Sequence, residues 1–519
     1  MSQHGAIVGL DFGMTNSILS YPGPNNEPIA HVMAGAETPA VPTAVDPSLM
    51  DRVFGAFAWT RLNVRENFKH LLPLVGLDAR ERRKNPDFIA ASAFLELLLK
   101  QYLAENGHAR YANVVATVPE SWLSGKQQGG VETLGQILTE IGIDDPEFLS
   151  EPVAAACYFA HNYRRALFGD APGKPFDGHI LVYDHGGSTL DIAVVRVEDN
   201  TVEVISSFGD AGEPGSSGFG GVEFDKRVMA RVCARERKNL SGQERAEWLR
   251  DFERQKRSAV SEIERRCKNP DYYNLRVDEI FKVQKLSVTL GDLVDTFEAV
   301  FADRIKSDIS QVLSDACTKV KIAVDDPKRF KVVPIGGFSQ FYPIQRLINT
   351  HFGVAQPGPG TIIYTGIKGP DRWQAVSKGA CLVASNVIQI NRTCPFTFGF
   401  VYYDQTEPYD QYFMRTGAEV RPYRTPKFLD EWFRLAVDPA KPDARSIVLF
   451  IENGGNRILL PMAKSFEQTL PDHGNAKRWQ LGCKVDNGTV WLALKSETGE
   501  SKTIRIGKLL RMIEGRIED

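Results

Sequence analysis

The sequence is informative first through what it lacks. Its seven cysteines are scattered singly, with no CxxC pair, which argues against a disulfide scaffold or a zinc cluster and fits a reducing cytoplasm. It has no basic, apolar leader at its start and no run of about 18 apolar residues that could span a bilayer. Neither sign of charge is in large excess, because 62 basic and 65 acidic residues give a net charge of only −3. Neither nucleic acid nor a membrane is therefore expected as a partner.

Two signatures of nucleotide-dependent enzymes are also absent. No G-x-x-x-x-G-K-[ST] segment occurs, which excludes a P-loop. The residues Asp11, Phe12 and Gly13 spell the magnesium motif of protein kinases. That motif lies at the N-terminus here and no H-R-D loop accompanies it, so we reject a protein kinase.

The pattern of the 519 residues predicts about three or four folding units. Strands and helices alternate up to about residue 385, including a helix from Asp87 that Gly107 closes. We also expect one long charged helix over 241–267 and another over 291–320. After residue 391 the pattern changes to short β-rich pieces, which predicts a small antiparallel β unit. Its strands are expected at residues 396–403, 446–453, 478–485, 489–496 and 502–509.

Three segments share one design, in which an apolar strand runs into a turn of small residues with a carboxylate or hydroxyl. They are residues 9–16, 183–189 and 335–339. Glycine turns let backbone N–H groups approach a phosphate closely. An Asp at the end of each of two strands can hold a hydrated Mg²⁺ between them, and the third turn could close over a base or ribose. Taken singly, each segment is typical of an ordinary tight turn with a capping Asp.

In this order and spacing the segments resemble the DnaK-type chaperones, the seventy-kilodalton heat-shock proteins of the actin and sugar-kinase superfamily. Residues 10–17 resemble the first phosphate loop of the family and residues 182–191 the second. Other family motifs have counterparts that they resemble at residues 150–156, 219–225, 253–258, 336–345 and 375–380. The resemblance spans residues 5–385. It implies an α/β, two-lobed actin-like ATPase with ribonuclease-H-like halves over residues 1–386.

The resemblance also implies roles for individual residues. Lys69 would offset charge on the transferring phosphoryl group and orient the attacking water, together with Glu151, Asp184 and Thr189 as catalytic residues. Asp11, Glu151 and Asp184 would hold Mg²⁺ through water. The residues implied to bind the nucleotide include Asp11, Gly13, Met14, Thr15, Asn16, Gly186, Gly187, Ser188, Gly220 and Gly221, of which Thr15 and the amides of Gly13, Gly186 and Gly187 would cradle the phosphates. The implied cofactors are ATP or ADP with Mg²⁺, and K⁺ as a second ion. The plain alternative for Lys69 is a solvated surface lysine.

Glu253, Lys256 and Arg257 would hold ribose and adenine from one helix, because such a spacing places them on one face. The alternative is an ordinary solvated charged face. Gly336, Gly337 and Phe338 would close over the base, and Phe338 could stack on it.

Several residues depart from the family pattern. Met14 replaces a threonine, Ser188 replaces a glycine, and Val260 replaces a serine. His185 replaces an apolar residue, and we expect a surface group there rather than a base. Gln340 cannot make the cation–π contact of the family arginine. Magnesium and phosphate handling is therefore expected to be kept, while base recognition is altered.

The resemblance continues more weakly beyond a predicted linker at residues 387–394. Residues 393–399, residues 413–415 into Pro422, and residues 485–492 resemble parts of the family's peptide-binding β-sandwich, which we place at residues 395–510. Such a sandwich binds extended apolar peptide through main-chain hydrogen bonds and a side-chain pocket. Only nine residues follow Leu510, so we expect no helical lid.

Two further departures bear on partners. The linker segment Val387–Asn391 lacks the family's leucine run ending in Asp, which predicts weakened coupling between the two sites. Glu147, Ser150 and Val153 depart from the residues of the family's J-domain docking surface, so a standard J-domain co-chaperone is doubtful.

Two functions follow. The first is a magnesium-dependent ATPase chaperone, with turnover that can be low, whose nucleotide state modulates binding of a polypeptide client. The alternative is a nucleotide-dependent scaffold or regulator with little turnover that binds one dedicated protein partner. A small-molecule kinase or a filament-forming actin relative is disfavoured by the C-terminal β unit and the charged helix of residues 253–258.

Overall fold

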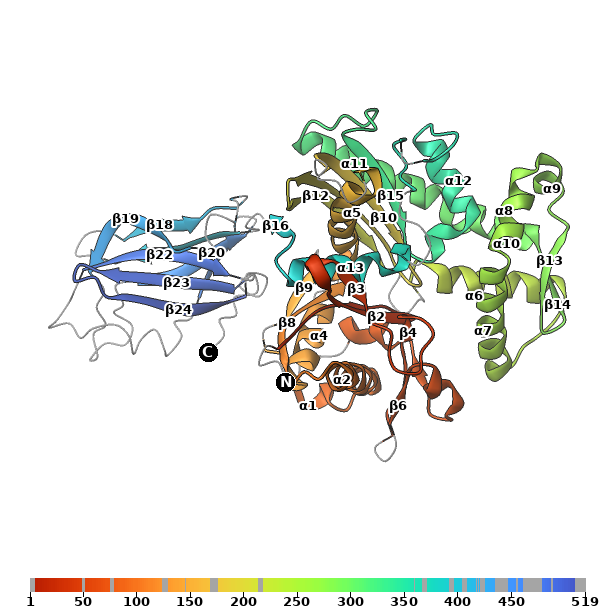
Figure 1. Cartoon of the computed structure of the whole chain (residues 1–519), viewed down its shortest axis with the longest axis horizontal. Coiled ribbons are helices and arrows are strands. Elements are labelled where there is room, and N and C mark those ends of the chain that lie inside the picture. Colours follow the sequence, from red (N-terminus) through yellow and green to blue (C-terminus); the bar gives the residue numbers. More distant parts are fainter. Residues whose placement is uncertain are drawn as a thin grey trace. The chain divides into compact units, whose positions relative to one another are not determined.

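The computed structural model divides the chain into two compact units, residues 1–390 and 391–519, which are described separately (Figure 1). The structure describes residues 5–48, 52–74, 79–123, 129–144, 146–168, 176–212, 218–358, 360–365, 371–391, 396–403, 408–416, 418, 420, 425–434, 447–453, 456–460, 478–486 and 489–508.

Lobe I of the first unit is built on a mixed sheet. Its strand order is β3-β2-β1-β8-β9, with β4 against β2. The neighbours β1 and β2 are antiparallel and joined by the predicted turn, whereas β8 runs parallel to both β1 and β9. The strands are β1 (Ala6–Phe12), β2 (Asn16–Pro22), β3 (Pro28–Ala30), β4 (Val41–Pro42), β8 (Tyr111–Val118) and β9 (Glu147–Ser150).

The helix predicted from Asp87 is α2 (Pro86–Asn106), and its ends have clear local causes. The Asn85 side chain accepts the backbone N–H groups of Asp87 and Phe88, and Gly107 closes the helix with φ 66°. A small sheet lies beside it, made of β5 (Ala44–Asp46), β6 (Val53–Phe54) and β7 (Arg65–Glu66). Short helical segments complete lobe I: η1 (Pro24–Asn26), η2 (Gly55–Thr60), η3 (Phe68–Leu74), α1 (Ala79–Arg82), α3 (Glu120–Leu123) and α4 (Gly129–Glu140).

Lobe II has a second sheet of order β15-β10-β11-β12-β16. Its members are β10 (Gly178–His185), β11 (Leu190–Glu198), β12 (Thr201–Asp210), β15 (Phe330–Ile335) and β16 (Gln389–Asn391). The last strand comes from the segment that we predicted as linker: the Gln389 N–H donates to the Asn200 carbonyl at 2.8 Å, and Ile388 is buried. The first half of that segment is therefore packed on lobe II, while the predicted domain boundaries stay a prediction.

The charged helix predicted over 241–267 is instead two helices, α7 (Gly242–Ser258) and α8 (Val260–Lys268), which meet at Ala259 with φ −91° and ψ 5°. Trp248 and Phe252 of α7 and Ile263 and Cys267 of α8 join one core. The helix predicted from Gly291 has a π-helical turn between two α-helices. The remaining elements of lobe II are α6 (Gly221–Arg235), α9 (Pro270–Leu275), β13 (Glu279–Val283), β14 (Leu286–Thr289), α10 (Leu290–Phe297), η4 (Glu298–Ala302), α11 (Asp303–Lys319), η5 (Phe338–Gln340) and α12 (Tyr342–His351).

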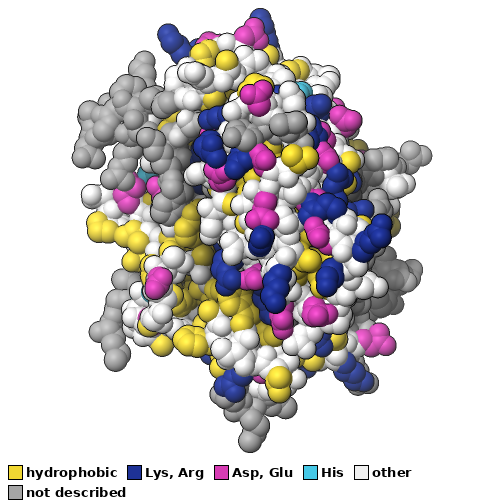
Figure 2. All heavy atoms as spheres, turned by 90° about the vertical axis from the view of Figure 1, so that its right-hand side faces the viewer, with side chains coloured by type: hydrophobic (Ala, Val, Ile, Leu, Met, Phe, Trp, Pro, Cys, Tyr) yellow, Lys and Arg dark blue, Asp and Glu magenta, His cyan; other side chains and the backbone are white. Residues whose placement is uncertain are grey.

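Figure 2 looks onto the side of the molecule where α7, α8 and the β13–β14 hairpin lie, and basic and acidic side chains alternate there. The alternation reflects helical ion pairs such as Arg265–Glu262 and Lys268–Glu264. Exposed pairs of this kind contribute little to stability.

Two helices pack directly on each other beside the sheets. They are α5 (Glu151–Phe168) and α13 (Asp371–Ala384). A Cβ at Gly379 would lie 1.7 Å from the Ala154 carbonyl oxygen, and a Cβ at Gly9 would lie 2.2 Å from the Cys381 nitrogen. The helix α13 is therefore in backbone contact with both α5 and β1, which only glycine permits at these positions. This contact sets α5, and with it Glu151, against the first sheet.

The second unit is an antiparallel β-sandwich. Two four-stranded sheets, β18-β17-β20-β21 and β19-β22-β23-β24, contribute side chains to one apolar core. The bounds are β17 (Thr397–Tyr402), β18 (Tyr409–Met414), β19 (Lys427–Arg434), β20 (Ile447–Asn453), β21 (Asn456–Leu459), β22 (Arg478–Asp486), β23 (Thr489–Ser496) and β24 (Ser501–Lys508). Pro422 and Leu510 lie outside the described residues, as do the residues after Leu510, where we expect no helical lid. Within the described part, no helix combines the length and apolar character needed to cross a bilayer.

Candidate functional site

A cleft of about 810 Å³ in the first unit collects almost every predicted site residue. Its walls come from β1, β2, η3, α5, the β10–β11 turn, α6, α7, α8, η5 and α13. All of the predicted residues line it except Gly220. Gly220 lies directly behind the second phosphate loop, because a Cβ there would sit 2.7 Å from the Gly187 carbonyl carbon. The sequence motifs therefore converge in space, although their ligand roles stay predictions.

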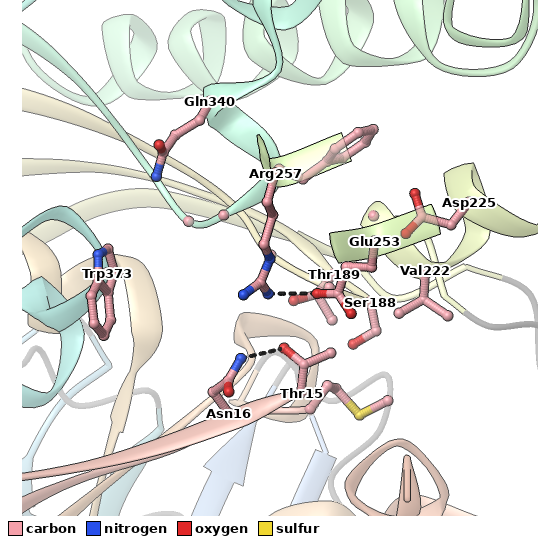
Figure 3. Close-up of a pocket in the computed structure, with 18 of the residues that line it drawn as sticks. Thr15, Asn16, Ser188, Thr189, Val222, Asp225, Glu253, Arg257, Gln340 and Trp373 are labelled. Carbon is pink, nitrogen blue, oxygen red and sulfur yellow. Dashed lines mark hydrogen bonds and ion pairs between the residues drawn. The ribbon is translucent and has the colours of Figure 1, made fainter. Parts of the chain in front are cut away.

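The first loop, residues 13–16, is held open by hydrogen bonds from Thr43. The Thr43 hydroxyl donates to the Gly13 carbonyl at 2.9 Å, and the Thr43 N–H donates to the Thr15 carbonyl at 2.9 Å. Gly13 is required here because a Cβ would lie 2.1 Å from the Asn16 carbonyl oxygen. Thr15 and Asn16 consequently face the cleft (Figure 3).

The second loop, residues 186–189, is the turn of the hairpin between β10 and β11. The Gly186 N–H donates to the Thr189 carbonyl at 3.1 Å, which places Gly187 and Ser188 at the tip. A Cβ at Gly186 would meet nothing within 4 Å, so the backbone there opens into the cleft. A third turn follows β15, where Gly336 has φ 83° and a Cβ would lie 2.5 Å from Asp184 Oδ1. Such glycine-rich, open backbone suits an anion.

A buried ion pair lies on the floor of the cleft between the loops. Lys69 Nζ is 2.7 Å from Glu151 Oε1, and the lysine side chain is only 3% exposed. The lysine is therefore not the solvated surface group that was the alternative. Local packing explains its burial, because the neighbouring Phe68 ring stacks at 6.3 Å from Phe12 in the lobe I core.

Around this pair the carboxyl groups outnumber the cations. Burial, with a smaller contribution from the Glu151 carboxylate, raises the pKa of Asp11 to about 7 against the opposing effect of Lys69. Burial also raises the pKa of Asp184 well above its usual range, and the nearby carboxyls of Glu151, Asp191 and Asp11 act in the same direction. Such crowding of like charge leaves the site short of positive charge.

The chemistry of this donor set fits a hydrated magnesium ion. Carboxylate oxygens are the hard ligands that Mg²⁺ prefers, and a divalent cation would relieve the mutual repulsion of Asp11, Glu151 and Asp184. No group of three or more His, Cys, Asp or Glu side chains is placed to hold a metal ion directly, as far as the described residues go. Binding of the ion through its water shell, as the resemblance implies, stays a prediction.

His185 is not the surface group that we expected. It is fully buried, and burial lowers its pKa to about 3. Its Nε2–H donates to the Phe219 carbonyl at 3.0 Å, so Nδ1 is free to accept the Tyr183 hydroxyl at 2.8 Å. His185 is therefore a neutral structural residue that ties the second loop to residue 219.

On the opposite side of the cleft, α7 places Glu253, Lys256 and Arg257 toward the cavity. Arg257 is exposed and paired with Glu253 (Figure 3). Lys256 instead pairs with the buried Asp225 and lies 5.5–5.6 Å from the centroids of three aromatic rings, Phe224, Phe252 and Phe338. Burial raises the pKa of Asp225 to about 6 despite this lysine.

The Phe338 ring, which could have stacked on a base, is part of the lobe II core. It is 5% exposed and packs against His185 at 4.8 Å, Phe224 at 5.0 Å and Phe341 at 5.8 Å between centroids. Phe338 lines the cleft, but little of the residue is exposed. This packing therefore does not favour the stacking role predicted for Phe338.

Two residues in or beside the cleft escaped the sequence analysis. Asp191 ends the second loop motif, and its Oδ1 accepts the Glu120 N–H at 2.9 Å beside the carboxyl cluster. Its place at the end of the motif was a usable signal. Trp373 lines the far wall, two residues before the motif that begins at Ala375. Nothing in spacing or composition marked it.

The fold and site define a two-lobed, actin-like α/β domain followed by a C-terminal antiparallel β unit. The sequence model of the Hsp70 protein family matches residues 72–385. The chain therefore belongs to the Hsp70 family.

Curated relatives are similar at low identity. The chaperone protein DnaK of Thermosipho africanus is 24% identical over 389 residues, 73% of this chain and 58% of the relative. That of Thermotoga neapolitana is 25% identical over 356 residues, 67% and 55% of the two chains. A heat shock protein of Pyricularia oryzae is 24% identical over 383 residues, covering 67% and 57%. This chain thus spans little more than half the length of the relatives it matches.

Proposed function

We propose that this protein is a magnesium-dependent, ATP-hydrolysing chaperone of the Hsp70 type, whose nucleotide state modulates binding of an extended polypeptide. The observation that carries the proposal is the buried Lys69–Glu151 pair among the carboxyls of Asp11 and Asp184, placed on the floor of a cleft lined by three glycine turns. Family membership supports it, because the matched relatives include proteins named as chaperones. The free state of the six described cysteines supports a reducing, cytoplasmic location.

The residues divide the chemistry between them. Amides and hydroxyls of the turns at Thr15, Gly187 and Ser188 would hold the phosphate oxygens of ATP or ADP. Mg²⁺, when bound through water by Asp11, Glu151 and Asp184, would offset the charge of the phosphates. Lys69 would stabilise the charge that develops on the transferring phosphoryl group and orient the attacking water.

The C-terminal sandwich would supply the polypeptide site. Its two sheets end in the edge strands β18, β21, β19 and β24, and extended peptides bind such sandwiches through main-chain hydrogen bonds. The client would be an unfolded, apolar segment. Coupling between nucleotide and client is part of the proposal and requires an element that both ligands bias.

The test is steady-state ATP hydrolysis with Mg²⁺, compared with the variants Lys69→Ala and Asp184→Ala. We expect turnover in the parent, loss of turnover in both variants, and nucleotide-dependent trapping of an unfolded model peptide. Lys100→Ala is a matched control, because Lys100 forms an exposed pair with Glu96 on α2. ATP binding without turnover would contradict hydrolysis and favour a nucleotide-dependent scaffold with one dedicated partner.

A further inference from the structure

The part of the cleft that would receive the base is not closed by the predicted residues alone. The Phe338 ring is buried against His185 and Phe341, and Lys256 pairs with Asp225. Arg257, Gln340 and Trp373 are among the side chains that line the remaining space (Figure 3). They come from three separate elements, α7, η5 and α13.

Trp373 offers an aromatic surface to this space. It lies in the first turn of α13, is half-buried, and points into the cavity. The helix is anchored by its backbone contacts with α5 and β1, so the indole is carried on a rigid element. Planar heteroaromatic rings stack favourably on tryptophan, and such stacking needs no particular base.

Gln340 offers hydrogen bonds at the same place. It ends η5, and its side-chain amide has no hydrogen-bond partner within the part of the chain that the structure describes. An amide has both a donor and an acceptor. It can therefore pair with the N6 donor and N7 acceptor of adenine, whereas guanine presents only acceptors along that edge.

We propose that Trp373 and Gln340 form the base-recognition wall of this chain, with Trp373 stacking on the purine and Gln340 selecting adenine over guanine. The inference rests on the proposed function, because it assumes a nucleoside triphosphate in the cleft. Arg257, which enters from α7 and is 64% exposed, would add a cation to the bound base. Recognition then uses an aromatic and an amide where the family motif leads one to expect an arginine.

The test measures dissociation constants by calorimetry with Mg²⁺ for three probes: ATP, GTP and inorganic tripolyphosphate, which lacks base and ribose. The variants are Trp373→Ala, Trp373→Phe and Gln340→Leu. Trp432→Ala is the matched control, because Trp432 lies on β19 of the other unit with 41% exposure. Tripolyphosphate binding also reports whether each variant is folded around the phosphate loops.

We expect Trp373→Ala to weaken ATP binding roughly tenfold or more, while Trp373→Phe stays within about threefold of the parent because a ring is kept. Tripolyphosphate affinity should change in neither. Gln340→Leu should bring the ATP and GTP affinities together. Unchanged ATP affinity in Trp373→Ala, or a retained preference for ATP in Gln340→Leu, would overturn the inference while leaving the proposed function standing. Failure of the parent to bind ATP and tripolyphosphate would overturn both.

Discussion

The two ends of the cleft are built on opposite principles. At the phosphate end, charged groups are buried and fixed: the Lys69 side chain is 3% exposed, and it lies among carboxyls whose pKa values are raised. At the base end, Arg257 and Glu253 form an exposed helical pair, while the Lys256–Asp225 pair is withdrawn beside an aromatic cluster. Crowded buried charge lowers stability and is tolerated where chemistry needs it. The comparison therefore teaches that the crowded, buried charge of the cleft is concentrated at the phosphate end.

The sharpest way to break this comparison is Asp184→Asn. The amide keeps the shape of the carboxyl but removes a buried acidic group whose ionised form is disfavoured by burial and by Glu151, Asp191 and Asp11. We expect ATP turnover to fall roughly a hundredfold or more, while the melting temperature of the empty protein at neutral pH rises. Asp199→Asn is the control, because Asp199 is an exposed turn residue between β11 and β12 of the same sheet. A lower melting temperature would show that the carboxyl stabilises the fold.

The second prediction concerns the pH dependence of stability. The pKa of Asp11 is about 7 in the folded protein and 3.8 without the fold, so the native state binds more protons between these values. Its contribution to stability is complete at low pH and is lost as pH rises through about 7. We expect the melting temperature of the empty protein to fall by several degrees between about pH 5 and about pH 8, and Asp11→Asn to remove part of that slope. An equal dependence of melting temperature on pH in the parent and in Asp11→Asn would contradict this prediction.

At the base end a smaller effect is expected from Arg257→Ala. The pair with Glu253 is exposed and helical, so its loss should leave the melting temperature nearly unchanged. Because Arg257 lines the cleft, we expect ATP affinity to weaken about threefold. Arg265→Ala removes a comparable exposed pair on α8 outside the cleft lining, and it should not alter ATP affinity. A larger stability loss for Arg257→Ala would erase the difference between the two ends.

The smallest effect is expected from Met14→Thr. Met14 lines the phosphate end without a hydroxyl, and threonine would return one hydrogen-bond donor to the first loop. We expect turnover to rise about twofold to fivefold, measured as phosphate release at saturating ATP. Met14→Leu, which adds no hydroxyl, should leave turnover unchanged. If both variants change turnover alike, packing of the first loop, and not its number of hydrogen-bond donors, limits turnover.

Sequence reasoning predicted that residues of the first two loops lie together, while their ligand roles stay predictions. Asp11, Glu151 and Asp184 each sit in short contiguous motifs whose spacing repeats the family pattern, and the structure brings them to one cleft. The strand–turn–strand segments at 6–22 and 178–198 were also accessible, because alternating apolar runs and glycine turns are local signals.

The base end was harder because its contacts are made between distant segments. The position of the Phe338 ring depends on Phe224, Phe301 and Phe341, and Lys256 is drawn away by Asp225, 31 residues earlier. No Gly or Pro marks the break at Ala259 between α7 and α8. The break depends on tertiary packing, because both helices turn apolar side chains to one core. His185 was misplaced for the same reason, because its burial depends on Tyr183 and Phe219.

The burial of His185 has a consequence for spectroscopy. The chain has nine histidines, but this one is held neutral, with a single N–H tautomer set by its two hydrogen bonds. With a pKa of about 3, its ring nitrogens should give chemical shifts that do not move over the ordinary working range of pH. The same nitrogens would respond when the second phosphate loop changes its distance to Phe219. The nuclear magnetic resonance signals of His185 should therefore report movement of this loop without a contribution from protonation of the ring.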